Sequence, residues 1–258
     1  MRPLEPDTSD LTIVDIDDCL FHTAARVAVV DDASGRVLTK LSSSQYTRYR
    51  LEEGERFDYT EFSEAKIFAE FSSPVEKMMR MSKVLLEIIR NKPGCQMILL
   101  TARSDFDDRD LFLDTFKRFD FDVGLSHVYR AGNLGSRTPT HENKREVLKS
   151  LIQGHVSQGN QIRAIRVFDD GMKNLDALYE TAVDLGVDSV STYLVDRDGS
   201  ASVRNQTKPD HLYSMVSEIV EAINQADPAG HDVKQEFIER FIAAGDHSQS
   251  QHNQLSPN

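Results

Sequence analysis

The 258-residue chain contains no tryptophan, only two cysteines, and fewer basic than acidic residues. Cys19 and Cys95 cannot build a disulfide framework, and they form no CxxC pair for zinc. The sequence has no run of about 18 apolar residues, so we expect no membrane-spanning helix. Its first residues, MRPLEPDTSD, lack the apolar segment of a secretory signal. These absences predict a cytoplasmic protein with no membrane partner and no disulfide-linked partner.

The formal net charge is −12 at pH 7. An acidic surface is repelled by nucleic-acid phosphates, which argues against broad, non-specific nucleic-acid binding. The charge is still compatible with a local basic patch, and with acidic residues that bind a metal ion. With 39% hydrophobic and 28% charged residues, the chain has the composition of a globular protein. Its length suits one large domain, or a core domain with a smaller insertion.

Apolar segments of strand length alternate with amphipathic segments of helix length. The predicted strands are Leu11–Asp15, Met97–Thr101, His127–Arg130, Ile162–Asp169 and Ser189–Val195. The predicted helices are Pro74–Asn91, Asp105–Phe119, Thr140–His155, Lys173–Leu185 and Leu212–Asn224. Ser73 and Glu76 have the spacing of an N-cap and its capping box for the first of these helices. The alternation predicts an α/β fold, namely a doubly wound parallel sheet with helices on both faces.

One region interrupts this alternation. In residues 26–72, Val27–Val30 and Arg36–Leu41 flank a short polar loop, a pattern typical of a hairpin. We predict a small hairpin-containing cap at 26–72, inserted after the first strand into a core of residues 1–25 and 73–225. For residues 226–258 we predict a short helix at Asp232–Ala244, followed by a polar, disordered end.

Chemically useful side chains follow the predicted strands. In an open parallel sheet, the carboxyl ends of the strands meet at one edge, where ligands bind. Acidic oxygens gathered there suit Mg²⁺, and a bound cation would relieve the repulsion between carboxylates. A carboxylate can also act as a nucleophile, while a hydroxyl and an ammonium hold phosphoryl oxygens. The residues at this edge are Asp15, Asp17, Thr101, Arg103, Asp169 and Asp170, with Lys144 in the helix before the fourth strand.

These positions resemble the motifs of the haloacid dehalogenase-like (HAD) superfamily of phosphohydrolases. The first motif, Asp-x-Asp after an apolar strand, is similar to Asp15-Ile16-Asp17. The second, an apolar strand ending in Thr or Ser, corresponds to the strand that ends at Thr101. The third is a lysine, for which we select Lys144. The fourth, an apolar strand ending in paired acids, corresponds to Asp169-Asp170. The resemblance covers Leu11–Val195.

The resemblance implies a role for each matched residue. Asp15 would be the nucleophile that forms an aspartyl-phosphate, and Asp17 would protonate the leaving group and then activate water. Thr101 would bind the phosphoryl group, and Lys144 would stabilise its charge. Mg²⁺ would be bound by Asp15, Asp169, Asp170 and the backbone carbonyl of Asp17.

The sequence departs from the family pattern at three places. Cys19 stands where the first motif usually has Thr or Val, and Asp18 where it often has Gly. Asn174 stands at the spacing where the fourth motif often has a further acid. Lys149 and Lys173 are alternatives to Lys144 as the motif lysine, and each could equally be a solvated lysine on a helix.

The substrate is less well defined than the chemistry. Arg103 would contact the substrate or pair with Asp107 and Asp108. In the cap, Arg50 and Tyr46 belong to a stretch where cations and aromatic rings are interleaved, which favours a nucleotide or a nucleic-acid end as substrate. A solvated hairpin face with packed tyrosines explains the same stretch equally well.

We therefore predict a Mg²⁺-dependent phosphatase that acts on a phosphate monoester of a small phosphorylated substrate. Two alternatives remain open. One is an enzyme that removes a terminal phosphate from RNA or DNA, and the other is a non-catalytic module that binds metal and phosphate.

Overall fold

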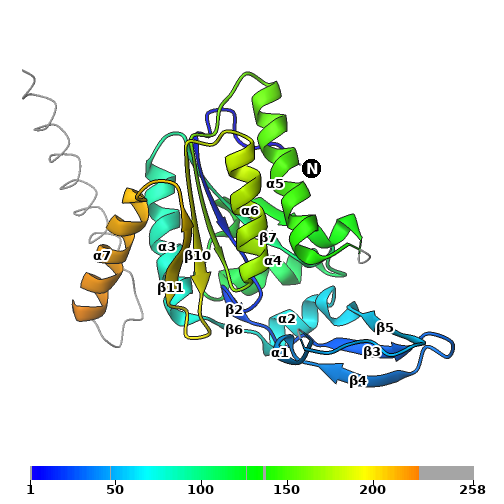
Figure 1. The fold of residues 1–258 in the computed structure, drawn as a ribbon. Coiled ribbons are helices and arrows are strands. Elements are labelled where there is room, and N and C mark those ends of the chain that lie inside the picture. Colours follow the sequence, from blue (N-terminus) through cyan, green and yellow to red (C-terminus); the bar gives the residue numbers. More distant parts are fainter. Residues whose placement is uncertain (1, 47, 126, 136–137, 227–258) are drawn as a thin grey trace, which may run out of the picture.

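The computed structural model describes residues 2–46, 48–125, 127–135 and 138–226. A central six-stranded sheet with the order β11-β10-β9-β1-β7-β8 dominates this part of the chain (Figure 1). The strands from β10 to β8 are parallel, whereas β11 pairs antiparallel with β10. The strand bounds are β1 Asp10–Val14, β7 Cys95–Thr101, β8 His127–Arg130, β9 Ala164–Asp169, β10 Ser189–Val195 and β11 Ala201–Gln206.

Helices cover both faces of this sheet, which confirms the predicted doubly wound α/β fold. Successive residues of a strand point to opposite faces. Ile13 and Ile98 therefore join the core beneath α5 and α6, whereas Val14 and Leu99 join the core beneath α3, α4 and α7. The helix bounds are α3 Glu76–Asn91, α4 Arg109–Lys117, α5 Thr140–Ser157, α6 Met172–Asp184 and α7 His211–Ala226.

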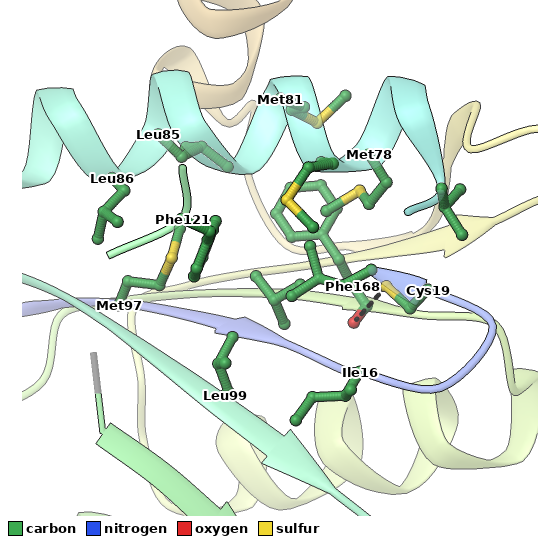
Figure 2. Packing of buried hydrophobic residues seen from close by; sticks show 14 of the residues in the cluster. Ile16, Cys19, Met78, Met81, Leu85, Leu86, Met97, Leu99, Phe121 and Phe168 are labelled. Carbon is green, nitrogen blue, oxygen red and sulfur yellow. Dashed lines mark hydrogen bonds between the residues drawn. The ribbon is translucent and has the colours of Figure 1, made fainter. Parts of the chain in front are cut away.

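The core under α3 is rich in methionine and phenylalanine. Figure 2 shows Met78 and Leu85 of α3 above Phe168 of β9 and Met97 of β7. Cys19 lies in the same layer, fully buried, and its Sγ donates to the carbonyl oxygen of Phe168 at 3.7 Å. Burial of a side chain of this size contributes about 1.5–3 kcal/mol to the free energy of unfolding. The layer therefore holds the loop after β1 against the sheet. Cys19 thus packs as a small apolar residue behind the aspartates.

Two predicted helix starts are wrong. Ser73–Pro74 forms the short strand β6, which pairs antiparallel with β2 (Phe21–His22), so Ser73 does not cap α3. Val75 is the N-cap instead, without a side-chain cap bond. The helix predicted from Asp105 begins at Arg109, because the Asp108 side chain accepts from the backbone N–H of Leu111 and caps α4 there.

A second, three-stranded antiparallel sheet follows β2, and β6 leads back into the core (Figure 1). The pairing of β3 with β4 confirms the predicted hairpin. The third strand was not predicted, because its sequence, ERFD, is short and polar and lacks a strand pattern. The cap bounds 26–72 stay a prediction. The elements of this segment are β3 Val27–Asp31, β4 Val37–Leu41, α1 Ser43–Tyr46, β5 Glu55–Asp58, the 3₁₀ turn η1 Thr60–Phe62 and α2 Ala65–Phe71.

The helix predicted at Asp232–Ala244 and the polar end after it lie outside the described residues. Within the described ranges, α7 ends at Ala226, and no helix is both long and apolar enough to cross a membrane.

Candidate active site

The order of the central strands places the predicted residues together. β1 lies between β9 and β7, and all three run parallel. Asp15 directly follows β1, Thr101 ends β7 and Asp169 ends β9. The backbone N–H of Asp15 extends the ladder by donating to the carbonyl oxygen of Phe168 at 2.9 Å. Because parallel strands end on the same side, the three side chains share one edge of the sheet.

An acidic cluster forms at this edge. Asp15, Asp169 and Asp170 each offer a carboxylate oxygen, and these oxygens lie within 4.8 Å of one another. Asp15 and Asp169 are buried, whereas Asp170 keeps an exposed side. Among the described residues, this is the one group of three or more His, Cys, Asp or Glu side chains that could hold a metal ion.

Lys144 lies between two of these acids. It belongs to the first turns of α5 and is 1% exposed. Its Nζ lies 2.9 Å from Asp15 Oδ1 and 2.7 Å from Asp169 Oδ2. Burial alone lowers the pKa of Lys144, but the charges of Asp15 and Asp169 outweigh it and raise this pKa well above its usual range. Lys144 is therefore a fixed cation at the cluster, whereas Lys149 and Lys173 are exposed.

Burial raises the pKa values of two of the acids in spite of Lys144. Burial, and then the charge of Asp169 and other acids, raises the pKa of Asp15 well above its usual range despite Lys144. Burial of the carboxyl of Asp170, and then the charge of Asp169, raises its pKa to about 7. The carboxylate of Asp169 has two hydrogen-bond donors: its Oδ1 accepts from the backbone N–H of Gly171 and from Asn174 Nδ2, each at 2.8 Å. Asn174 thus orients a candidate metal ligand.

Asp17 has a different environment, although it is only two residues from Asp15. Its carboxylate is held by the guanidinium of Arg103, with Nε 2.8 Å from Oδ2 and Nη2 2.6 Å from Oδ1. Arg103 also donates to the Phe62 carbonyl oxygen and to Thr23 Oγ1, at 3.0 and 2.9 Å. The rings of Phe62, Phe68 and Phe106 lie 5.1, 5.1 and 5.4 Å from the guanidinium carbon. A buried arginine thus fixes the orientation of Asp17.

The alternative pairing of Arg103 with Asp107 and Asp108 is not seen. Asp107 Oδ1 accepts from the backbone N–H of Ala65 at 2.8 Å, and Asp108 caps α4. Thr101 is fully buried beside the pair, where its Oγ1 accepts from the Arg103 backbone N–H at 3.1 Å and lies 3.4 Å from Asp17 Oδ2. The backbone between Thr101 and Arg103 therefore positions both groups.

Two local conformations support this edge. Asp18 has a φ of +55°, in the left-handed region, and its Oδ1 accepts from the Thr23 backbone N–H at 3.2 Å. Gly132 packs against the loop after β7 so closely that a Cβ there would lie 2.4 Å from the Ala102 carbonyl oxygen. Only glycine fits at that position without displacing the segment that carries Arg103.

The donor set fits a divalent cation. With all four ionised, as metal binding requires, Asp15, Asp17, Asp169 and Asp170 would carry four negative charges, and Lys144 and Arg103 carry two positive ones. The difference equals the charge of one divalent cation. Asp15 Oδ1 is buried and has no well-oriented hydrogen bond within the described residues, although Lys144 Nζ lies 2.9 Å away, so it can accept a further ligand. Oxygen-only ligands of this kind suit Mg²⁺. The carboxylate of Asp17 is not part of the cluster, and its backbone carbonyl remains a predicted ligand.

A cavity of about 700 Å³ opens beside the acidic cluster. Asp18 and Asp170 line it, together with Met172. Two further lining residues, Arg26 and Arg197, were not among the predicted site residues. No motif marks either residue: Arg26 is one of several basic residues in the predicted cap, and Arg197 follows a strand whose end carries no recognisable motif.

The predicted substrate residues of the cap lie outside its strands, Tyr46 at the end of α1 and Arg50 between α1 and β5. The Tyr46 hydroxyl is 3.0 Å from that of Tyr59, and its ring packs edge-on against Phe57. Arg50 is exposed, and its Nη1 donates to the Tyr49 carbonyl oxygen. Neither residue lines the cavity beside the acids. A substrate role for Tyr46 and Arg50 stays a prediction.

Comparisons with known proteins give little further guidance. No protein-family model matches the chain, and no curated protein matches it either. Among solved structures, the chain is similar to the HAD domain of effector protein Lem4 from Legionella pneumophila, with a TM-score of 0.40 and 11% identity. The match covers 84% of this chain and 96% of that domain. Likeness at this level carries no argument about activity, so the chemistry of the site rests on its own residues.

Proposed function

We propose that the protein hydrolyses a phosphate monoester with the help of Mg²⁺, through an aspartyl-phosphate intermediate, as the resemblance to HAD-like phosphohydrolases implies. One observation carries the proposal. Two carboxylates, two residues apart after β1, lie in separate environments: Asp15 faces Lys144 and the acidic cluster, and Asp17 is held by Arg103. Carboxylates placed in different environments can take different catalytic roles.

In the first step, an Asp15 oxygen forms a bond to phosphorus while the bond to the leaving-group oxygen breaks, and Asp17 gives that oxygen a proton. In the second step, Asp17 takes a proton from water as the water oxygen bonds to phosphorus. The acyl phosphate bond then breaks, which releases inorganic phosphate and restores Asp15. The first step requires Asp17 to carry a proton, which the second step restores, and Arg103 fixes the orientation of this carboxyl group.

The remaining residues would offset or bind the negative charge of the phosphoryl group. Lys144 neutralises Asp15 before the reaction and the phosphoryl oxygens during it. Thr101 Oγ1, which donates to Asp17 Oδ2 at 3.4 Å in the structure, would donate to a phosphoryl oxygen of the substrate instead. Asp15, Asp169 and Asp170 would hold Mg²⁺, which when bound supplies positive charge that offsets the charge of the phosphoryl group.

The test is phosphate release from a panel of phosphate esters with Mg²⁺, comparing the parent with Asp15→Asn. A matched control is Asp114→Asn, which removes an exposed carboxylate of α4 whose one ion pair within the described residues is with Lys117. We expect release by the parent and the control, and none by Asp15→Asn. Activity that survives in Asp15→Asn would refute the covalent mechanism. Mg²⁺ binding without turnover of any ester would instead favour the non-catalytic binding module.

A further inference from the structure

The cavity beside the acidic cluster is lined by two parts of the chain that are far apart in sequence. Arg26 immediately precedes β3 at the entry to the small sheet, and Arg197 follows β10 of the central sheet. Between them the lining includes the acid Asp170 and the apolar side chains of Met172 and Leu194. The cavity therefore has an acidic end, an apolar part and two cations.

Both guanidinium groups are unused within the described parts of the chain. The backbone N–H of Arg26 donates a hydrogen bond to Glu61 Oε2 at 2.8 Å, but within the described residues its guanidinium forms no hydrogen bond and no ion pair. Arg197 forms neither a side-chain hydrogen bond nor an ion pair there. By contrast, Arg103 and Arg204 are each paired with a carboxylate. Two exposed arginines without partners in one cavity are available to a ligand.

The charge of the lining indicates what that ligand carries. Apart from the cluster, the lining has Asp18 and Asp196 against the two arginines. At the cluster itself, a divalent cation and Lys144 would balance the ionised carboxylates of Asp15, Asp169 and Asp170. A phosphoryl group bound at the acids and the metal does not need the arginines as well. The arginines therefore suit a second anionic group on the same molecule, and a guanidinium matches phosphate oxygens in a bidentate manner.

We propose that Arg26 and Arg197 form a second anion subsite, and that the substrate carries a second phosphate group besides the one that is removed. This inference rests on the proposed phosphatase function and specifies its substrate class. The second phosphate has two possible sources, a small bisphosphorylated molecule or the phosphodiester next to the end of an oligonucleotide. The apolar lining from Met172 and Leu194 would contact the organic part between the two phosphates.

The experiment compares three substrates that share one terminal phosphate: a nucleoside monophosphate, the corresponding nucleoside bisphosphate and an end-phosphorylated dinucleotide. It measures kcat and KM with Mg²⁺ for the parent, Arg26→Gln and Arg197→Gln. The control is Arg163→Gln, because Arg163 is also exposed and has no side-chain partner among the residues that the structure describes, but lies at the opposite end of the sheet, before β9. Equilibrium binding of the same compounds to Asp15→Asn, with and without the arginine substitutions, gives a second readout that needs no turnover.

We expect each Arg→Gln substitution to raise KM for the two substrates with a second phosphate about tenfold or more, with kcat nearly unchanged. KM for the monophosphate should change little, and the control substitution should change none of the three. Whichever of the two compounds with a second phosphate binds more tightly identifies the source of that phosphate. Equal losses for all three substrates, or no loss for any, would overturn the subsite.

Failure of the subsite and failure of the phosphatase proposal can be told apart. If the parent released phosphate but its KM did not depend on the arginines, the subsite alone would be wrong. If no ester were turned over, yet binding of the bisphosphate to Asp15→Asn weakened on substitution of either arginine, the subsite would be supported and the phosphatase proposal would fail.

Discussion

Replacing Arg103 by lysine tests whether this residue orients Asp17. The substitution keeps the positive charge but removes the planar guanidinium, which contacts Asp17, the Phe62 carbonyl oxygen and Thr23. Lysine carries three donors on a single nitrogen, so it cannot reproduce a two-pronged contact with the carboxylate. The Arg103 side chain is fully buried, so water cannot take the place of the lost donors.

The expected cost follows from these contacts. Hydrogen bonds to charged groups contribute about 1.5–3 kcal/mol each. Arg103→Lys loses at least two bonds and keeps one ion pair, so the free energy of unfolding should fall by about 3 kcal/mol. For a domain of this size that loss corresponds to a melting temperature lower by about 6–12 °C. Since Asp17 would also lose its fixed orientation, kcat should fall about 100-fold, the lower end of the usual contribution of a general acid.

The assay is denaturant unfolding in a chelator, followed by steady-state kinetics with Mg²⁺. The matched control is Arg204→Lys, because Arg204 pairs with Asp176 through two bonds of 3.1 Å, but both side chains are about 40% exposed. An exposed pair contributes less than about 1 kcal/mol, so the control should change little. If Arg103→Lys lowered stability but left kcat unchanged, Arg103 would not govern the orientation of Asp17. Equal effects for the two pairs would contradict the argument from burial.

Three further predictions concern the same edge of the sheet. Lys144→Met should lower the free energy of unfolding by about 3–5 kcal/mol, because it leaves two buried carboxylates uncompensated, and added Mg²⁺ should recover part of this loss in thermal unfolding. Asp170→Asn removes a carboxylate whose pKa is raised by burial and by Asp169, which means that its charged form destabilises the fold when no metal is bound. In a chelator we therefore expect the melting temperature to rise by about 2–4 °C. Added Mg²⁺ should raise the melting temperature of this variant less than that of the parent. Gly132→Ala should lower the free energy of unfolding by at least about 2 kcal/mol, because the added Cβ would collide with backbone atoms. Its control, Gly154→Ala in α5, has open space around the new Cβ and should raise the free energy of unfolding by up to about 1 kcal/mol. Similar values for the two variants in denaturant unfolding would show that the loop after β7 moves to accept the new side chain.

The sheet and its ligand-binding edge could be predicted from the sequence because both depend on local patterns. Apolar segments such as Met97–Thr101 identify strands, and their alternation with helices leaves a parallel sheet as the consistent arrangement. In such a sheet, the residue after each strand has a known position. Asp15, Thr101 and Asp169 could therefore be brought to one edge without knowledge of any contact.

Features that depend on contacts between distant segments could not be predicted in this way. Ser73 and Glu76 have the spacing of a capping box, but pairing of Ser73–Pro74 with β2 outweighs that local preference. The antiparallel strand β11, with the sequence ASVRNQ, is mostly polar and exposed, so no apolar pattern marks it. Arg197 belongs to the cavity only because β10 ends beside the segment that carries Arg26.

The donors of Arg103 explain why substrate recognition has to come from other residues. A guanidinium has five N–H donors. Arg103 uses Nε on Asp17, Nη2 on Asp17 and Thr23, and Nη1 on the Phe62 carbonyl oxygen, so one donor has no acceptor within the described residues. Three aromatic rings surround the guanidinium, and its side chain is fully buried. Because the side chain is fully buried, this spare donor could reach a substrate only if a neighbouring group moved. Arg103 is therefore expected to act on the substrate mainly through Asp17, whereas the exposed Arg26 and Arg197 of the proposed subsite can bind it directly.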